Sequence, residues 1–405
     1  MAFAMLSFTS RFAVSSTPKT WCIRPSTSSE RPRRVFLSRN MAILSSPQPG
    51  STPPKVLVTG ANGYIAMWIV RLLLEKGYAV RGAVRSEEKV AALTDAFGKV
   101  HSEWSDRLEW AVVPDITKDG AFDESVKGVE AIVHTAAPLD TTTDDPDEYI
   151  KPSVNGTLSL LTSALKHGSG VKRVAITSSC TAAVTFKTPQ AEPGPLPFRE
   201  TGWAEEAIET VKKDGAKTPD SIKYRAAKTL AERAAFDFVE KNKDKLSWDI
   251  STLLPSVVIG PNLGAPKSPE VLNASLNRFY RSLFTNEPEE FLKSTICSVD
   301  VRDVAQAHLS SLVKEAAGGQ RFLVSGHATT WQRIRDVAYD INHVWYSDEI
   351  LPRGNPDLPR DIVYFFDNNK SRDVLGIEYE SLEKTVGDTM ADFEGRGWVE
   401  KKVSL

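Results

Sequence analysis

The sequence has few cysteines and no long apolar run. Only three of its 405 residues are cysteine, Cys22, Cys180 and Cys297, and their number and spacing predict neither a disulfide framework nor a zinc site. No apolar run approaches the roughly 20 residues that cross a bilayer. We therefore expect no metal centre and no membrane span.

An excess of charge of either sign is also missing. The chain has 50 Lys and Arg against 52 Asp and Glu, a formal net charge of −2, so no global field attracts nucleic acid or an acidic membrane surface. Apolar residues make up 41% and charged residues 25% of the chain, which are ordinary values for a globular protein. A chain of this length buries a full core, as one large or two modest domains.

Residues 1–54 differ in composition from the rest. Residues 1–40 contain one acid, Glu30, against seven Lys and Arg, with many Ser and Thr. This composition is typical of an organellar transit peptide. A disordered extension, or an over-long gene model whose true start is Met41, explains it equally well. The first interpretation predicts a mitochondrial protein and the others a cytoplasmic one; in each case the fold is expected to begin near Lys55.

From there on, short apolar runs alternate with segments of helical period. The runs at 55–60, 79–85, 108–113, 130–137, 173–179 and 248–260 predict strands, and those at 64–77, 86–97, 120–128, 147–168 and 221–236 predict helices. Strands that alternate with helices and are apolar throughout indicate a parallel sheet covered on both faces. The fold class predicted is α/β, a Rossmann-type doubly wound parallel sheet. Ligands of such sheets bind outside the carboxyl ends of the strands.

The spacing loosens after Pro261. We expect 55–261 to form the sheet domain, with the loop 185–220 joining a smaller C-terminal lobe. That lobe is expected to be built mainly from 262–405, while 295–326 returns to the sheet.

The first predicted strand runs into a glycine-rich turn. Gly60 allows a tight turn, Gly63 allows close approach of a pyrophosphate, and the small Ala66 allows close packing of helix on strand. The start of the helix then offers N–H groups to phosphate. We expect this segment to bind a dinucleotide through Gly60, Asn62, Gly63, Tyr64 and Ile65.

The end of the second predicted strand distinguishes the cofactors. NAD sites place an acid there, whereas NADP sites need a cation. This chain has Arg85, followed by Lys89, and a guanidinium forks well onto a 2′-phosphate. The alternative, that both are solvated surface cations, is supported by the neighbouring Glu87 and Glu88. The missing acid favours NADP(H).

Later strand ends supply further candidates. Asp115, beside Ile116, is placed to accept from an adenine amino group, or to cap a helix. Ala136, in "HTAAP", leaves room for a cofactor backbone, as a buried strand end would. Ser178 and Ser179 follow the fifth strand and are either substrate-binding hydroxyls or turn-forming serines.

Tyr224 and Lys228 are four residues apart in a predicted helix, which places them on one face. A tyrosine with its ordinary pKa near 10 is a poor acid at neutral pH, and a lysine charge within about 4–6 Å lowers that pKa. The pair therefore predicts a general acid and its electrostatic partner. An aromatic residue beside a solvated lysine is the alternative.

Together these motifs resemble the extended short-chain dehydrogenase/reductase family, dihydroflavonol-reductase-like branch. Further matching segments are "VNGTLSLL", "LLPSVVIGP" and "VDVRDVAQAHL", and the resemblance covers roughly residues 55–398. It implies that Tyr224 is the general acid, that Lys228 lowers its pKa and binds the nicotinamide ribose, and that Ser179 orients the carbonyl, with Ser178 as the alternative. It also implies a supporting role for Asn155, and nicotinamide contacts from Pro255 and Val258.

The resemblance implies an NADPH-dependent carbonyl reductase for aldehydes or ketones, active in specialised metabolism. A small, hydrophobic carbonyl compound is the expected partner, and the chain is expected to be a monomer or a homodimer. A sterol or hydroxysteroid dehydrogenase of the same family is one alternative. A non-catalytic NADP-sensing regulator is the other, although such proteins typically lose the Tyr or the Lys.

Overall fold

The computed structural model describes residues 43–399, apart from 101, 138–142, 186–193 and 343–348. The arginine-rich N-terminal segment, on which the transit-peptide prediction depends, lies outside the described residues. Within the described residues, no helix has both the length and the apolar character needed to cross a bilayer.

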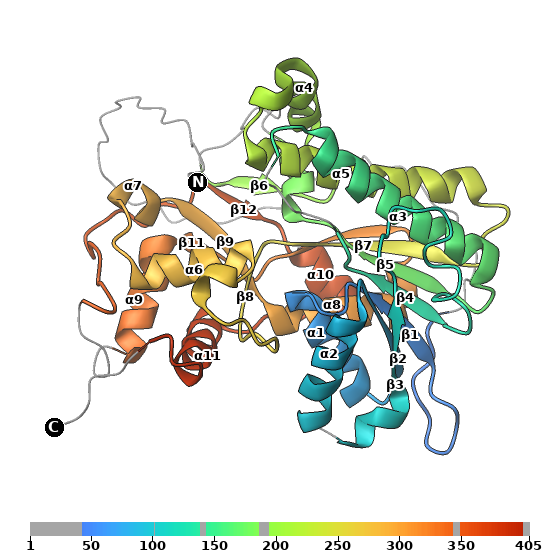
Figure 1. Ribbon diagram of the computed structural model, residues 1–405. Helices are drawn as coiled ribbons and strands as arrows, with labels where there is room; N and C mark the ends of the chain where they lie inside the picture. Colours follow the sequence, from blue (N-terminus) through green and yellow to red (C-terminus); the bar gives the residue numbers. More distant parts are fainter. Residues whose placement is uncertain (1–42, 101, 138–142, 186–193, 343–348, 400–405) are drawn as a thin grey trace. The chain divides into compact units, whose positions relative to one another are not determined.

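In the described residues, the largest sheet has seven strands in the order β10-β7-β5-β4-β1-β2-β3, all of them parallel (Figure 1). The bounds are β1 Lys55–Thr59, β2 Ala79–Val84, β3 Leu108–Val112, β4 Ala131–His134, β5 Arg173–Thr177, β7 Asp249–Pro255 and β10 Gln320–Val324. The predicted Rossmann-type parallel sheet is confirmed. The chain reverses direction across the sheet beside β1, where doubly wound sheets bind their ligands.

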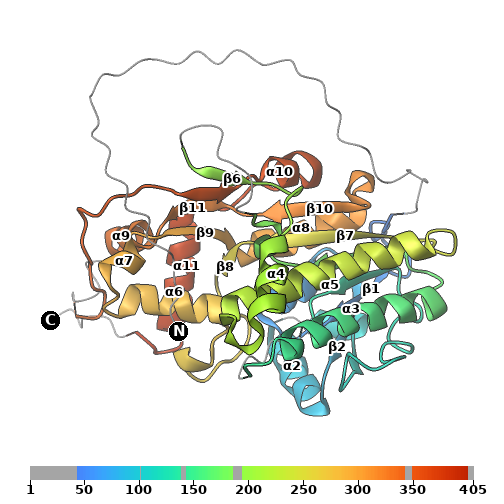
Figure 2. The same cartoon turned by 90° about the horizontal axis from the view of Figure 1, so that it is seen from above.

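Both faces of this sheet are buried. In β1, Val56 and Val58 point to one face, where they pack with α1 (Tyr64–Glu75), α2 (Glu87–Val100) and α8 (Val301–Val313). Leu57 points to the other face, where α3 (Asp147–His167) and α5 (Asp220–Asn242) lie side by side along the sheet (Figure 2). The side chains of a strand alternate between faces, so these runs are apolar without a break.

One predicted helix is wrong. Residues 120–128 form a series of turns, and Gly120 and Gly128 at its ends have φ of +73° and +70°. Phe122 and Val126 of this segment are nevertheless buried against the face that carries α3. The left-handed glycines end any helix at this length, and the two apolar side chains reach the core from turns.

A second core lies in the C-terminal part of the chain. It joins side chains of α6 (Ala274–Phe284), α9 (Trp331–Asn342) and α11 (Leu382–Gly395) around Phe279, Trp331 and Phe393. A sheet of β8 (Val257–Ile259), β9 (Thr295–Asp300) and β11 (His327–Thr330) borders it. β6 (Leu196–Phe198) pairs with β12 (Tyr364–Phe366). The remaining α-helices of the described residues are α4 (Glu205–Asp214), α7 (Glu289–Leu292) and α10 (Asn369–Leu375).

The stretch 295–326 divides between the two parts. Its first strand, β9, pairs with β8 and β11. After α8 the chain crosses back, and β10 pairs in parallel with β7 at the edge of the main sheet. Because β9, α8 and β10 follow one another directly, this stretch links the second core to the sheet.

Candidate active site

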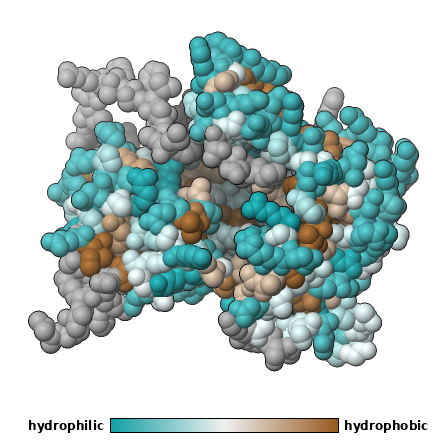
Figure 3. Space-filling view, viewed as in Figure 1, coloured by the Kyte–Doolittle hydropathy of each residue, from teal (hydrophilic) through white to brown (hydrophobic). Residues whose placement is uncertain are grey.

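The carboxyl ends of β1, β4 and β5 meet at one edge of the sheet. The hydroxyl of Thr59 lies 2.8 Å from Nδ1 of His134, and the hydroxyl of Thr135 donates to the Thr59 carbonyl at 2.5 Å. Figure 3 shows a hollow with apolar residues on its floor, on the face of the molecule seen in Figure 1. The side chains predicted from strand ends lie along this edge.

The glycine-rich turn follows β1 directly. Gly60 has φ of +64°, and a Cβ added there would lie 3.0 Å from the Cα of Ala136. Gly63 donates its N–H to the Gly60 carbonyl at 2.8 Å and precedes α1 without a side-chain cap. The first N–H groups of α1, which have no partner within the helix, therefore lie beside an exposed turn. Such a turn fits a phosphate group.

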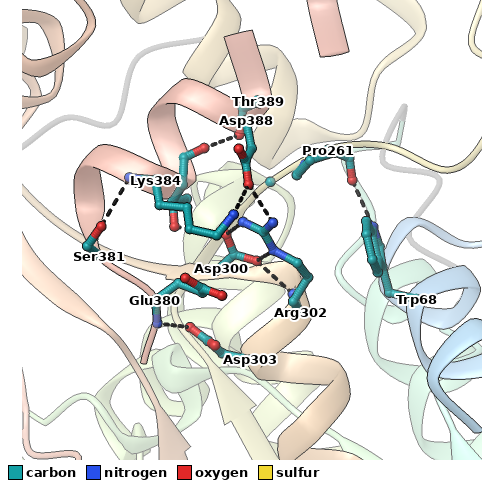
Figure 4. A network of polar contacts seen from close by, with 12 residues as sticks. Trp68, Pro261, Asp300, Arg302, Asp303, Glu380, Ser381, Lys384, Asp388 and Thr389 are labelled. Atoms are coloured by element: carbon teal, nitrogen blue, oxygen red, sulfur yellow. Dashed lines mark hydrogen bonds and ion pairs between the residues drawn. The ribbon is translucent and has the colours of Figure 1, made fainter. Parts of the chain in front are cut away.

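The side chains of Tyr64 and Ile65 pack into the protein. The Tyr64 hydroxyl donates to the Gly260 carbonyl at 2.8 Å, and burial raises the pKa of Tyr64 well above its ordinary value. One turn on, Nε1 of Trp68 donates to the Pro261 carbonyl at 2.8 Å (Figure 4). The Tyr64 side chain thus holds the turn against the chain after β8, and the backbone N–H groups of Tyr64 and Ile65 are left for a ligand.

An ion-pair network lies next to these contacts (Figure 4). The fully buried carboxylate of Asp300 accepts two hydrogen bonds from the Arg302 guanidinium and one from the Thr385 hydroxyl. Arg302 also bonds Asp388 of α11 at 2.5 Å. Removing one partner of a buried pair costs about 3–5 kcal/mol because the other charge is left without compensation. The network therefore fixes α11 against the start of α8.

Arg85 and Lys89 lie just after β2. Arg85 is exposed, and within the described residues neither side chain forms an ion pair. Arg81, in the same strand, differs, since its guanidinium bonds Glu109 at 2.6 Å and the carbonyls of the segment before β4. Of the two arginines of this strand end, Arg85 is the one left to bind an anion.

Asp115 has local partners. Its Oδ1 accepts from the hydroxyl of Thr117 at 2.6 Å and from the N–H of Thr117 at 2.9 Å, and the hydroxyl, followed by the N–H, lowers the Asp115 pKa. These contacts close a local turn two residues long, and the helix-capping alternative is wrong, because residues 116–128 form turns and no helix follows Asp115. Ile116 reaches α3, where a Cβ on Gly156 would lie 2.7 Å from its Cδ1.

The two serines after β5 face different neighbours. Ser178 is buried and donates to Oε2 of Glu232 at 2.8 Å. Ser179 lies close enough to Tyr224 to lower its pKa, and the Ser179 oxygen accepts from the hydroxyl of Thr181 at 3.0 Å. The structure thus brings Ser179, and not Ser178, to the tyrosine.

Tyr224 and Lys228 share one face of α5, with Nζ of Lys228 5.9 Å from the centre of the Tyr224 ring. Burial lowers the pKa of Lys228 to about 8, and the Glu232 carboxylate acts in the opposite direction. The expected lowering of the Tyr224 pKa by Lys228 is not found. Burial raises the Tyr224 pKa, against a smaller lowering by Ser179, because taking the phenol out of water disfavours its charged form.

A small cavity lies behind Lys228. It is lined by residues of β4, α3, β5 and α5, among them His134, Ala136, Ser153, Thr157, Lys228 and Glu232. Asn155 is exposed and does not line this cavity. Ser153 and Thr157, four residues apart on α3, point to one side, whereas Asn155, between them, points away.

Pro255 and Val258 flank the junction of β7 and β8. Both are buried, and Pro255 pairs with Val324 of β10. Ser178 donates its N–H to the Leu253 carbonyl of β7 at 2.8 Å. The strand that precedes the junction, β7, therefore lies beside the two serines.

Sequence reasoning missed two charged residues of the site. Glu232 lies four residues after Lys228, and this helical spacing was a signal that could have found it. Arg321, which binds Glu232, is 89 residues away in the chain, and no local pattern connects the two.

A parallel sheet of this order, with a glycine turn after β1 and a Tyr–Lys pair beside a serine, is typical of dinucleotide-dependent oxidoreductases of the short-chain dehydrogenase type. The sequence model of the NAD dependent epimerase/dehydratase family matches residues 56–325. The chain belongs to this family, the extended short-chain dehydrogenase/reductases, in the dihydroflavonol-reductase-like branch. The predicted resemblance is confirmed.

Named relatives match over nearly their whole length. Ketoreductase azaE of Aspergillus niger is 36% identical, with 84% of this chain and 98% of the relative covered. NADPH-dependent methylglyoxal reductase GRE2 of Saccharomyces cerevisiae is 34% identical over 84% of this chain and 99% of the relative. Tetraketide alpha-pyrone reductase 1 of Arabidopsis thaliana is 31% identical, with 85% and 97% covered.

Solved structures of relatives have the same fold. Yeast methylglyoxal/isovaleraldehyde reductase Gre2 complexed with NADPH has a TM-score of 0.73 and 32% identity, over 84% of this chain and 99% of that chain. Gre2 of Candida albicans in complex with NADPH has a TM-score of 0.74 and 30% identity, over 85% and 99%. These relatives are NADPH-dependent reductases.

Proposed function

We propose that the protein is an NADPH-dependent carbonyl reductase that converts an aldehyde or ketone to an alcohol. The observation that carries this proposal is the meeting of Ser179, Tyr224 and Lys228 at the edge of the sheet that also holds the glycine turn. The reductase names of the relatives support the same reaction.

The residues present fit NADP(H). Gly60 leaves a cradle against Ala136 that a Cβ would fill, and the uncapped start of α1 suits the pyrophosphate. Arg85 and Lys89 would hold the 2′-phosphate, and Lys228 the nicotinamide ribose. When bound, the reduced cofactor supplies the hydride.

The chain's own residues supply the proton and the orientation. The Ser179 hydroxyl would hold the carbonyl oxygen of the substrate next to Tyr224. The raised pKa of Tyr224 keeps its hydroxyl protonated at neutral pH, so that it can donate a proton to the developing alkoxide. Lys228, with a pKa of about 8, is largely cationic at neutral pH, and in this state its ammonium can bind the nicotinamide ribose.

The substrate is proposed to be a small, hydrophobic carbonyl compound of specialised metabolism. Next to Ser179 the chain places an apolar cluster that includes Cys180, Val184, Phe198 and Phe366. Two of the relatives are named as a ketoreductase and a tetraketide alpha-pyrone reductase, and both names fit a hydrophobic ketone.

The test is the consumption of NADPH with a panel of aldehydes, ketones and polyketide-like compounds, each measured with NADH in parallel. We expect NADPH to be oxidised with at least one hydrophobic carbonyl, and the matching alcohol to be found by mass spectrometry. Tight NADPH binding with no carbonyl reduced would contradict the reductase and favour a cofactor sensor.

We propose that the protein is located in the cytoplasm and that it is a monomer or a homodimer. The buried thiols of Cys180 and Cys297 are unpaired, as expected in a reducing compartment. Light scattering of the purified protein tests the oligomer. Fluorescent fusions of the full chain and of a chain that begins at Met41 test the compartment, and mitochondrial import of the full chain alone would overturn the cytoplasmic assignment.

A further inference from the structure

A carboxylate with no access to water lies behind the Tyr–Lys pair. Glu232 is 2% exposed and lines the same cavity as Lys228, one helical turn further along α5. Its Oε2 accepts from the Ser178 hydroxyl at 2.8 Å, and its Oε1 from the Thr252 hydroxyl at 2.6 Å. It therefore ties α5 to the ends of β5 and β7.

The counter-charge comes from the far edge of the sheet. Nε and Nη2 of Arg321, on β10, donate to the two oxygens of Glu232 at 2.8 and 3.2 Å. Nη1 of Arg321 bonds the carbonyls of Glu200 and Gly202, and its guanidinium lies 3.6 Å from the ring centre of Trp203. The pair is thus fully bonded, as a buried ion pair has to be.

We propose that Glu232 is a positioning residue of the reductase site. Its carboxylate anchors the serine segment through the hydrogen bond from Ser178. The same carboxylate, balanced by Arg321, supplies the negative charge that acts on Lys228 in the cavity. Because it names how the catalytic lysine and serine are held, this inference rests on the proposed function.

The charges around Lys228 support this role. Within the described residues, the cavity presents to Lys228 the carboxylate of Glu232 from α5 and the imidazole of His134 from β4. Burial, and then the Lys228 charge, lower the pKa of His134 to about 3, so this imidazole is neutral at pH 7. Tyr224 is protonated there as well. Glu232, offset by Arg321 from β10, is therefore the charged group that holds the proton on Lys228.

Two substitutions separate this role from a purely structural one. Glu232→Gln removes the negative charge, so the pKa of Lys228 should fall below about 8, by about one pH unit. Arg321→Gln leaves the Glu232 charge less balanced, so the same pKa should rise. The double variant restores the balance of charge and should return close to the unmodified protein. Loss of packing alone gives no reason for shifts of opposite sign.

Two readouts are needed. The first is the pH at which kcat falls on the alkaline side, which should move with the Lys228 pKa, while KM for NADPH changes little at neutral pH. The second is the titration of Lys228 followed by NMR in protein with isotope-labelled lysine, with the signal assigned by its loss in Lys228→Arg. This second readout needs no substrate, so it tests the positioning role even if no carbonyl is reduced.

The matched control is Glu205→Gln with Arg233→Gln, which removes a partly exposed ion pair between α4 and α5. It should leave both readouts unchanged. If a single variant does not fold, the double variant, which buries no charge, is compared with Ser178→Ala, which removes the anchor alone and should lower kcat without moving the Lys228 titration. The proposal is overturned if Glu232→Gln and Arg321→Gln shift the titration in the same direction, or if neither shifts it.

Discussion

The ammonium of Lys228 lies 5.9 Å from the centre of the Tyr224 ring, and both side chains are largely withdrawn from water. Burial lowers the pKa of the lysine to about 8 and raises that of the tyrosine. Both shifts have one cause, since the charged form of either group is disfavoured away from solvent. At neutral pH the Tyr224 hydroxyl therefore stays protonated.

Replacing Tyr224 by Phe should remove most turnover while leaving NADPH affinity within about twofold. A positioned general acid contributes about 100- to 10,000-fold to rate, and the phenyl ring keeps the packing. Steady-state kinetics and a fluorescence titration with NADPH measure the two effects. Tyr280→Phe, in the C-terminal core, is the control and should keep its turnover. Unchanged turnover in Tyr224→Phe would remove Tyr224 from the mechanism.

Replacing Arg85 by Ala should weaken NADPH binding by about 10- to 100-fold, the value of a hydrogen bond to a charged group. NADH has no 2′-phosphate, so its affinity should change little. Dissociation constants for both cofactors, measured by calorimetry, test this. Arg281→Ala removes an exposed arginine of α6 and should alter neither. Equal losses for both cofactors would contradict the assignment of Arg85 to the phosphate.

Replacing Gly60 by Ala should weaken both the fold and NADPH binding. A left-handed φ costs an alanine roughly 1–2 kcal/mol, and the added Cβ would meet the backbone of Ala136. Gly128 is the matched control, because its φ is +70° and a Cβ there meets nothing within 4 Å. Gly128→Ala should lose only the conformational energy in urea unfolding and keep NADPH affinity. Equal behaviour of the two variants would argue against a cofactor cradle at Gly60.

The protein should lose stability in mild acid through His308. Its Nδ1 donates to the Val304 carbonyl and its Nε2 lies 2.8 Å from the Thr177 hydroxyl, and burial lowers its pKa to about 4. A depressed histidine pKa means that the unfolded chain binds the proton first, so stability falls as pH drops from the unfolded value near 6.5 towards 4. Between pH 7 and 5, His308→Gln should therefore lose about 2 kcal/mol less than the unmodified protein.

Asp303 gives the opposite sign and serves as the control. Burial raises its pKa to about 7, so the folded chain binds this proton first and stability rises as pH falls from 7 towards the unfolded value. Asp303→Asn should then lose about 2 kcal/mol more than the unmodified protein over the same pH interval. Urea unfolding at the two pH values measures both variants. Parallel changes in the two would mean that burial does not set these pKa values.

Much of the site could be predicted because its residues follow local rules. The glycine turn ends a strand and begins a helix, and Tyr224 and Lys228 obey the helical spacing that puts them on one face. Asn155 shows where such rules stop. It sits in a helix that was predicted, yet only the packing of α3 against the sheet decides that Ser153 and Thr157 face the cavity and that Asn155 faces solvent.

The sequence by itself determined the alternation of strands and helices, the order of the motifs along one edge of a parallel sheet, and the cation after β2. These depend on contacts between residues close in the chain or on the direction that all parallel strands share. The tertiary structure alone decided that Ser179 meets Tyr224 while Ser178 turns inward, that burial and not the lysine sets the direction of the tyrosine pKa shift, and that Arg321 balances Glu232. Each of these depends on desolvation or on a partner far away in sequence, and both arise only when the chain is packed.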